Sequence, residues 1–355
     1  MKKRNVSVEF ARLIASFVVI LCHCNFFAVF APESEGLHRF TTCLLADSVG
    51  MFWLITGFYF LRSSDYKKLW LSTIKKIVIP GLLIILITQF LTDPIVRGIP
   101  FSESEAFSSA ELKRFFISLI TFRETSVYWY VFAYILVVLI QPLLFRLGAW
   151  LDGGVSREIT FFVITLALLA TNDICGNTLL HFSYSGIFVL MPAAIEVMWG
   201  HILFRHREFW LRPSMAVYEI ILFIVLLIGH TVAYGRMLDR DLGTDLVSWY
   251  SCFGFLMATL AVILCMQIVR DEEHSFDDAI RFPAGFTYPI YLIHPFLLSF
   301  FKERGFFGMM YDWLIVIFLP GVASILSVFV GFVIFYLLSF GIAVLLRRLC
   351  RAIHY

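Results

Sequence analysis

Charged residues are scarce in this chain of 355 residues, because Asp, Glu, Lys and Arg together make up only 15% of it. A soluble globular domain of ordinary composition carries about 25% of such residues. No long hydrophilic stretch is present either, so we expect no appended soluble domain. The formal net charge is only +2. Its basic residues gather at the ends of apolar runs, which is typical of membrane topology signals and argues against nucleic-acid binding.

Cysteine pairs of the CxxC type are also absent, although the chain has seven cysteines. Most of them fall in apolar segments, where cysteine behaves as a small hydrophobic residue. Cys22 and Cys24 flank His23, but neighbouring residues of a helix point about 100° apart and cannot easily share one metal ion. We therefore expect no metal site. The phosphate-binding sequence G-x-x-x-x-G-K-[ST] is missing, which argues against an ATP-driven transporter.

Apolar residues make up 60% of the chain, and the mean hydropathy is +0.86. They predict an all-α, polytopic membrane bundle of about ten transmembrane helices. The predicted spans cover residues 8–30, 41–61, 77–92, 127–146, 158–172, 184–204, 214–234, 246–269, 284–301 and 313–346. Those at 77–92 and 158–172 look short, and Pro320 with Gly321 is expected to kink the last one. A cleaved signal peptide is the alternative for the start, but that run lacks a small-residue cleavage site and contains Arg12.

The basic residues also predict the orientation of the chain. With the N-terminus inside, the inner segments carry 18 Lys and Arg residues and the outer segments carry nine. Cytoplasmic segments of membrane proteins are enriched in such residues, so both termini are predicted to be cytoplasmic.

One predicted outer connection, residues 93–126, is longer than the others. Ser108 and Glu111 have capping-box spacing there. Apolar residues at helical spacing follow them: Leu112, Phe115, Phe116, Leu119 and Ile120. The pattern indicates a helix lying on the outer membrane surface, and a packed lid without function is the alternative.

Arg12 and His23 share the first apolar segment. Eleven residues turn a helix by about three full turns, so both side chains fall on one stripe, about 16 Å apart along the axis. Arg12 could extend to the inner headgroups, or it could bind a phosphorylated cytoplasmic ligand. His23 could be a neutral histidine bonded to a neighbouring helix, or a general base. Charged and titratable groups within the membrane usually mark functional sites.

Two more of the ionisable residues inside predicted spans, His294 and Glu196, are candidates for a functional site. His294 falls near the middle of the ninth span, at a height close to that of His23. Pro295 loosens the helix there and frees backbone carbonyls. The two histidines either share a polar cavity or bond separately to backbone. Glu196, in the sixth span, could hold a histidine in orientation or pair with a basic residue.

Four segments, taken in order, resemble membrane acyltransferase family 3. The first is Arg12-x10-His23. Residues 49–58 (VGMFWLITGF) are similar to a second-span pattern ending in Ser-Gly-Phe, with Thr56 in place of serine. Residues 128–132 (YWYVF) and 291–295 (YLIHP) resemble its aromatic and late tyrosine–histidine motifs. The family usually has an arginine-rich loop before the third span, where this chain has Lys75 and Lys76, which lack the bidentate fork of arginine.

The resemblance implies a single transmembrane acyltransferase domain over residues 1–355. It implies transfer of an acyl group, usually acetyl, from cytoplasmic acyl-CoA to a sugar hydroxyl. The acceptor would be a cell-surface glycan or its lipid-linked precursor, and the protein would lie in a bacterial cytoplasmic membrane among lipids. Acetyl-CoA would be a co-substrate, with no bound cofactor and no nucleic-acid partner. The oligomeric state stays open.

The same resemblance, with the chemistry of the side chains, suggests roles for site residues. The predicted catalytic set is His23, Arg12, His294 and Tyr291. Arg12, Lys75 and Lys76 are expected to hold the donor phosphates. His23 would take the acceptor proton, or form a covalent acyl-histidine relay. Tyr291, His294 or a backbone N–H would stabilise the oxyanion.

Trp129 and Tyr130 are predicted to bind the acceptor, with an ordinary interfacial aromatic belt as the alternative. Two other classes of function compete with acyl transfer. One is an ion-coupled transporter or flippase for a lipid-linked sugar, although no matching half-sequences suggest an inverted repeat. The other is a sensor without catalysis, which would leave the alignment of Arg12 and His23 unexplained.

Overall fold

The computed structural model describes residues 5–24, 35–46, 48–61, 65–100, 108–121, 128–175, 186–239, 250–270 and 276–353. Across these ranges the chain forms helices and no strand. The predicted all-α architecture is therefore confirmed.

The helices follow one another along the chain, with η2 and η3 wound as π-helices and η6 as a 3₁₀-helix. They are α1 (Val6–His23), α3 (Glu35–Leu45), α4 (Ser48–Phe60), α5 (Tyr66–Thr73), η2 (Ile74–Val78), α6 (Ile79–Leu91), η3 (Thr92–Arg97), α7 (Ser109–Thr121), α8 (Trp129–Leu139), α9 (Gln141–Leu151), α10 (Val155–Cys175), η6 (Gly186–Val189), α11 (Leu190–Arg205), α12 (Arg207–Trp210), α13 (Pro213–Leu238), α14 (Cys252–Ile268), α15 (Asp277–Ala284), α16 (Thr287–Glu303), α17 (Phe306–Ile315) and α18 (Pro320–Ile353).

Within the described ranges, seven helices are long and apolar enough to cross a membrane. The number rises to nine if each of two bent pairs counts as one span. These pairs are α8 with α9, bent by 66°, and α15 with α16, bent by 54°. Every predicted span overlaps one of these helices or pairs, or the shorter apolar helix α14. The count of ten and the cytoplasmic termini stay predictions.

Three details of the predicted spans were wrong. The third span was predicted to begin at residue 77, but its helix begins at Tyr66, where Asp65 accepts a hydrogen bond from the backbone N–H of Lys68 at 3.0 Å. Its lysines interrupt the apolar pattern without interrupting the helix, since lysine is a good helix former. The helix α10 has 21 residues and is not short. Pro320 starts α18 and does not kink it, because proline fits the first turn of a helix.

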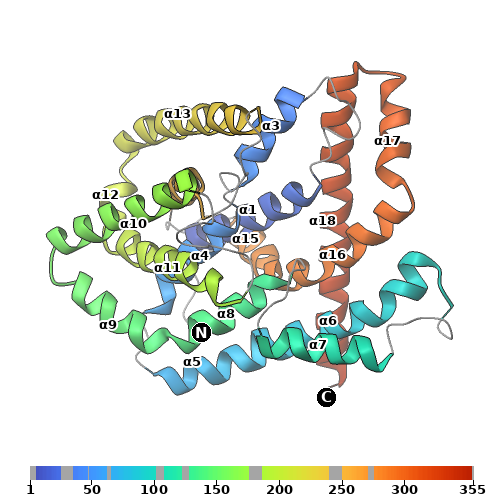
Figure 1. Cartoon of the computed structure of the whole chain (residues 1–355), viewed down its shortest axis with the longest axis horizontal. Helices are drawn as coiled ribbons and strands as arrows, with labels where there is room; N and C mark the ends of the chain where they lie inside the picture. Colours follow the sequence, from blue (N-terminus) through green and yellow to red (C-terminus); the bar gives the residue numbers. More distant parts are fainter. Residues whose placement is uncertain are drawn as a thin grey trace.

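The central helix of the bundle is α1, which packs against α4, α14, α15, α16 and α18. Figure 1 shows α1 in the middle of the molecule close to α4 and α15, whereas α13 runs along one edge. The helices α17 and α18 stand side by side at another edge (Figure 1). The stripe of α1 that carries Arg12 and His23 therefore faces the interior of the protein.

Two glycines let α4 and α11 approach closely. A Cβ at Gly57 would lie 2.1 Å from the carbonyl oxygen of Val197, and one at Gly200 would lie 2.0 Å from that of Leu54. Only a residue without a side chain fits at such distances. Small residues serve the same purpose wherever membrane helices pack backbone to backbone. This contact fixes α4, which forms one wall of the site described below.

The helix predicted in the long outer connection exists as α7. Its first turn is capped as expected, with the backbone N–H of Glu111 donating to Ser108 Oγ at 3.2 Å. Phe116 and Ile117 are exposed. The other side chains of the predicted apolar pattern, Leu112, Phe115, Leu119 and Ile120, lie outside the described part of the structure. Contact of α7 with the membrane surface stays a prediction.

Candidate active site

The site begins with the way α1 is started. The side-chain oxygen of Asn5 accepts a hydrogen bond from the backbone N–H of Val8 at 3.2 Å. This N-cap fixes the first residue of the helix and thus the direction of every later side chain. Glu9 follows in the first turn, where the helix dipole stabilises a carboxylate. Its partner Arg12 lies one turn further on.

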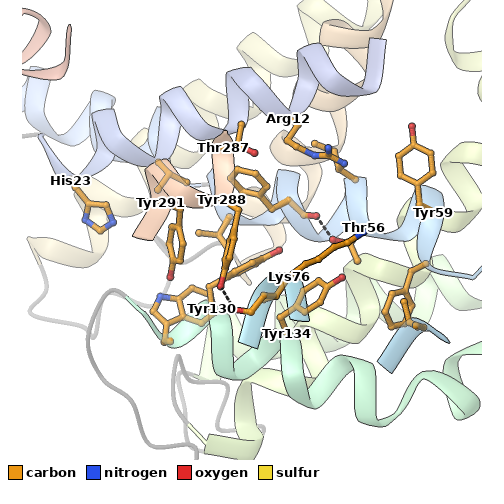
Figure 2. Close-up of a pocket in the computed structure, with 18 residues that line it drawn as sticks. Arg12, His23, Thr56, Tyr59, Lys76, Tyr130, Tyr134, Thr287, Tyr288 and Tyr291 are labelled. Carbon is orange, nitrogen blue, oxygen red and sulfur yellow. Dashed lines mark hydrogen bonds between the residues drawn. The ribbon is translucent and has the colours of Figure 1, made fainter. Parts of the chain in front are cut away.

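A cavity of about 440 Å³ runs beside α1. It is lined by Arg12, Val19 and His23 of α1; Val49, Phe52, Ile55, Thr56, Tyr59 and Phe60 of α4; Leu69 of α5; Lys76 and Ile77 of η2; Trp129, Tyr130 and Tyr134 of α8; and Thr287, Tyr288 and Tyr291 of α16. Figure 2 shows Arg12 and His23 on the same helix, with tyrosines and a lysine facing them. The shared stripe predicted from helical spacing is confirmed by this common cavity.

Arg12 is held inside the protein. Its Nη1 atom lies 2.7 Å from Oε1 of Glu9, whose side chain is 1% exposed, while that of Arg12 is 25% exposed. The pair therefore directs the guanidinium into the cavity, so the alternative of a side chain extended to the headgroups does not describe this structure. Arginine has five N–H donors in a planar fork. Those that do not contact Glu9 are available to an anion entering the cavity.

The two histidines meet at the other end of the stripe. The ring centroids of His23 and His294 are 5.3 Å apart. His23 lines the cavity, whereas His294 is 2% exposed and lies behind it. The backbone carbonyls of Ile290 and Tyr291 lie beside the His294 ring. Neither ring nitrogen of His294 makes a hydrogen bond of ordinary geometry with the described residues. His23 therefore adjoins the cavity, whereas His294 contacts the ring of His23 without lining the cavity itself.

Tyr291 joins these histidines to the aromatic wall. Its ring centroid lies 5.8 Å from that of His294 and 5.8 Å from that of Tyr130. Tyr130 in turn packs edge to face on Trp129 at 6.1 Å. Trp129, Tyr130 and Tyr291 all line the cavity. The three aromatic residues predicted to serve the site are therefore brought together.

The two neighbouring lysines behave differently. Lys76 lines the cavity and Lys75 does not. Both are exposed residues of η2. Thr56, the residue that replaces the serine of the family motif, lines the cavity, and its hydroxyl donates to the carbonyl of Phe52 at 2.8 Å. Only one of the two predicted lysines thus adjoins the space between Arg12 and His23.

Glu196 is placed elsewhere. It is 2% exposed and lies on α11, where its carboxylate adjoins Gly50: a Cβ built at Gly50 would lie 2.9 Å from its Oε2. Glu196 does not line the cavity that holds His23. Glu196 thus lies beside the contact of α4 with α11, and its role as an orienting carboxylate stays a prediction.

Three tyrosines that line the cavity were missed by the sequence reasoning, namely Tyr59, Tyr134 and Tyr288. Tyr134 follows Tyr130 by four residues, and Tyr288 precedes Tyr291 by three, so each lies on the same helix face as a residue that was predicted. Helical spacing could have found Tyr134 and Tyr288. In the part of the chain that the structure describes, no group of three or more His, Cys, Asp or Glu residues is arranged to hold a metal ion.

Comparison with known proteins agrees with the motifs. The model of a family described as an acyltransferase domain matches residues 5–348, nearly the whole chain. No curated protein and no solved structure matches the chain. The matched region includes every residue that lines the cavity.

Proposed function

Since the chain belongs to acyltransferase family 3, we propose that it transfers an acyl group, most simply acetyl, from cytoplasmic acyl-CoA to a hydroxyl of a glycan or its lipid-linked precursor. Acyl transfer in general follows from the family, and the apolar helices make the protein a multi-pass membrane protein. The donor, the acceptor, the individual roles and a bacterial cytoplasmic membrane as its location are the proposal.

One observation carries the proposal. A single cavity has an arginine near one end of a helical stripe and a histidine near the other. The helical rise between them is about 16 Å. Acyl-CoA has an anionic head and a reactive thioester at the end of a long thin arm. The separation of Arg12 and His23 suits a molecule of that shape.

At the end near Arg12, two cations could hold the donor. Arg12 offers a planar fork that suits phosphate oxygens, and Lys76 adds a point charge. Both line the cavity. Lys75 does not reach this space, so the donor site is proposed for Arg12 and Lys76 alone. The thioester would then lie further along α1, beside His23.

At the histidine end, the reaction is written as a direct transfer. His23 takes the proton from the acceptor hydroxyl as its oxygen attacks the thioester carbonyl carbon. The new C–O bond forms, the C–S bond breaks, and the coenzyme A thiolate leaves. The proton on His23 then passes to that thiolate. A covalent acyl-histidine is the alternative route for the same atoms.

The neighbours of His23 support separate roles. Tyr291 lines the cavity and is proposed to stabilise the tetrahedral oxyanion, for which positioned donors are the usual device. His294 lies behind His23 in ring contact and is proposed as a positioning residue. Trp129 and Tyr130, on the facing helix α8, are proposed to bind the acceptor, since sugar rings stack on aromatic faces. Glu196 has no role in this scheme.

Turnover by the purified protein tests the proposal. Protein in lipid nanodiscs is given acetyl-CoA and candidate glycan acceptors, and free coenzyme A and acetylated product are measured. We expect acceptor-dependent coenzyme A release that His23→Ala abolishes. His201→Ala is the matched control, because His201 lies outside the cavity and bonds to Asp152 at 3.0 Å. Movement of a lipid-linked sugar across liposomes without coenzyme A release would favour the transporter.

A further inference from the structure

The helix that carries Lys76 changes its winding at that residue. The segments α5, η2 and α6 follow one another without a break. In η2 the backbone N–H of Ile79 donates to the carbonyl of Ile74, five residues earlier, as in a π-helix. Pro80 supplies a cause, since proline has no N–H and clashes with the carbonyl four residues before it, here that of Lys76. Single π-turns inside α-helices are rare and frequently lie at functional sites.

Only one of the two lysines in the altered turn reaches the cavity. Each residue of a regular α-helix advances the side-chain direction by about 100°, and a π-turn inserts an additional residue into that sequence. Residues before and after the turn are therefore rotated against each other. Lys75 and Lys76 are both exposed within η2, yet only Lys76 lines the cavity.

A tyrosine from another helix holds the turn in place. The hydroxyl of Tyr288, in the first turn of α16, donates to the carbonyl of Ile77 at 2.6 Å (Figure 2). Gly81 makes room for it, because a Cβ there would lie 2.7 Å from that hydroxyl oxygen and 3.1 Å from a methyl group of Val131. The contact fixes η2 against the wall that carries Tyr291.

We propose that Pro80, Gly81 and Tyr288 are positioning residues for donor binding: they hold the π-turn against α16 so that Lys76, and not Lys75, meets the phosphates of the acyl donor. This inference rests on the proposed function, since it takes the donor to lie between Arg12 and His23. It adds the reason why one of two adjacent lysines serves the site. It also assigns a part to Gly81, which does not itself line the cavity.

Lysine reactivity tests the inference without measuring activity. Protein in nanodiscs is treated briefly with an amine-acylating ester, with and without saturating coenzyme A, and modification of each lysine is read by peptide mass spectrometry. In the wild-type protein we expect coenzyme A to protect Lys76 by about fivefold or more and Lys75 by less than twofold. In Gly81→Ala the added Cβ displaces Tyr288, and protection of Lys76 should fall below twofold.

Gly341→Ala is the matched control, because a Cβ at Gly341 would meet nothing within 4 Å. It should retain the wild-type pattern. If Gly81→Ala does not fold, Tyr288→Phe keeps the ring and removes only the donated hydrogen bond, and it should weaken protection of Lys76 by about twofold or more.

Two outcomes would contradict the inference and separate it from its premise. Equal protection of Lys76 in the wild-type protein and in both variants overturns the positioning role and leaves the donor site standing. Protection of neither lysine in the wild-type protein overturns the donor site itself, and the positioning role with it.

Discussion

Two of the walls of the cavity differ in how they are built. The α1 wall carries Arg12 and His23 and packs against α3, α4, α14, α15, α16 and α18, with 56% of its most apolar stretch buried in the protein. The opposite wall, α5–η2–α6, carries Lys76 and is only 17% buried by the same measure. Outside its own segment it makes its main contacts with α8 and α16. The chemically demanding groups thus lie on the firmly packed wall, and an auxiliary cation lies on the peripheral one.

This contrast shows that the two walls are suited to different tasks. The α1 wall holds its side chains in fixed positions, and the α5–η2–α6 wall is more easily displaced. A general base must stay within about half an ångström of its working position, which a helix packed on several sides provides. A wall with few contacts is more easily displaced. Substitutions on α1 should therefore damage the reaction far more than equivalent substitutions on η2.

The largest effect is expected at His23. His23→Ala should lower kcat by about 10²- to 10⁴-fold, the usual contribution of a general base. Thermal unfolding of the variant, followed beside that of His201→Ala, shows whether the loss is chemical. A well-folded His23→Ala protein with kcat near that of the wild type would show that His23 is not the general base. It would also contradict the expectation that substitutions on α1 have larger effects than those on η2.

Arg12 comes next, and its effect should fall on the donor. Arg12→Ala should raise the KM for acetyl-CoA by about 10- to 100-fold, as expected for the loss of a charge-assisted hydrogen bond, with a smaller change in the KM for acceptor. Arg114→Ala is a matched control, since its side chain is 76% exposed on α7. An unchanged donor KM would count against the phosphate role.

Glu9 should affect donor binding through Arg12, with which it forms an ion pair. Glu9→Ala removes the anchor of the guanidinium and should raise the donor KM by about three- to tenfold, as for one hydrogen bond. Added to Arg12→Ala, it should have little further effect. A double-mutant cycle on donor KM measures this coupling. If the two effects simply multiply, Glu9 acts on folding or on some other group and does not position Arg12.

The smallest effect distinguishes the neighbouring lysines. Lys76→Met should raise the donor KM by about two- to fivefold, because the residue is exposed and exposed ion pairs are weak. Lys75→Met should change it by less than that, since Lys75 does not line the cavity. Donor KM measured at low and at high salt sharpens the test, because screening should reduce the effect of Lys76 only. Equal effects would mean that the lysines act as general surface charge.

The arrangement of Arg12 and His23 on α1 could be predicted from the sequence because α1 is a regular α-helix. A constant 100° per residue placed Arg12 and His23 on one stripe, and depth counting placed His294 beside them. Counting residues from the end of a span gives the depth of His294 in the membrane but not the direction of its side chain. It therefore did not reveal that His294 lies behind His23. The same limit applies to Glu196, which is buried deep in α11 but turned toward Gly50.

The peripheral wall was predicted less well for a physical reason. Counting along a helix assumes uniform winding, and the π-turn at η2 breaks that assumption. Lys75 and Lys76 were grouped because both lie near the predicted inner face, and the direction of each side chain was not considered. Pro80, four residues after Lys76, was the local signal of a change in winding. Its effect on the cavity depends on Tyr288, more than 200 residues away in sequence, and no local pattern contains that contact.

The volume of the cavity has one more consequence. A space of about 440 Å³ that contains an arginine, a lysine and a histidine holds on the order of ten solvent molecules when no substrate is bound. In the proposed reaction, a base that deprotonates a sugar alcohol would deprotonate H2O as readily, so a solvent molecule left beside His23 would compete as a nucleophile and hydrolyse the thioester. The arm of the donor would have to displace this solvent as it enters, and the ratio of transfer to hydrolysis would depend on how completely the donor fills the cavity.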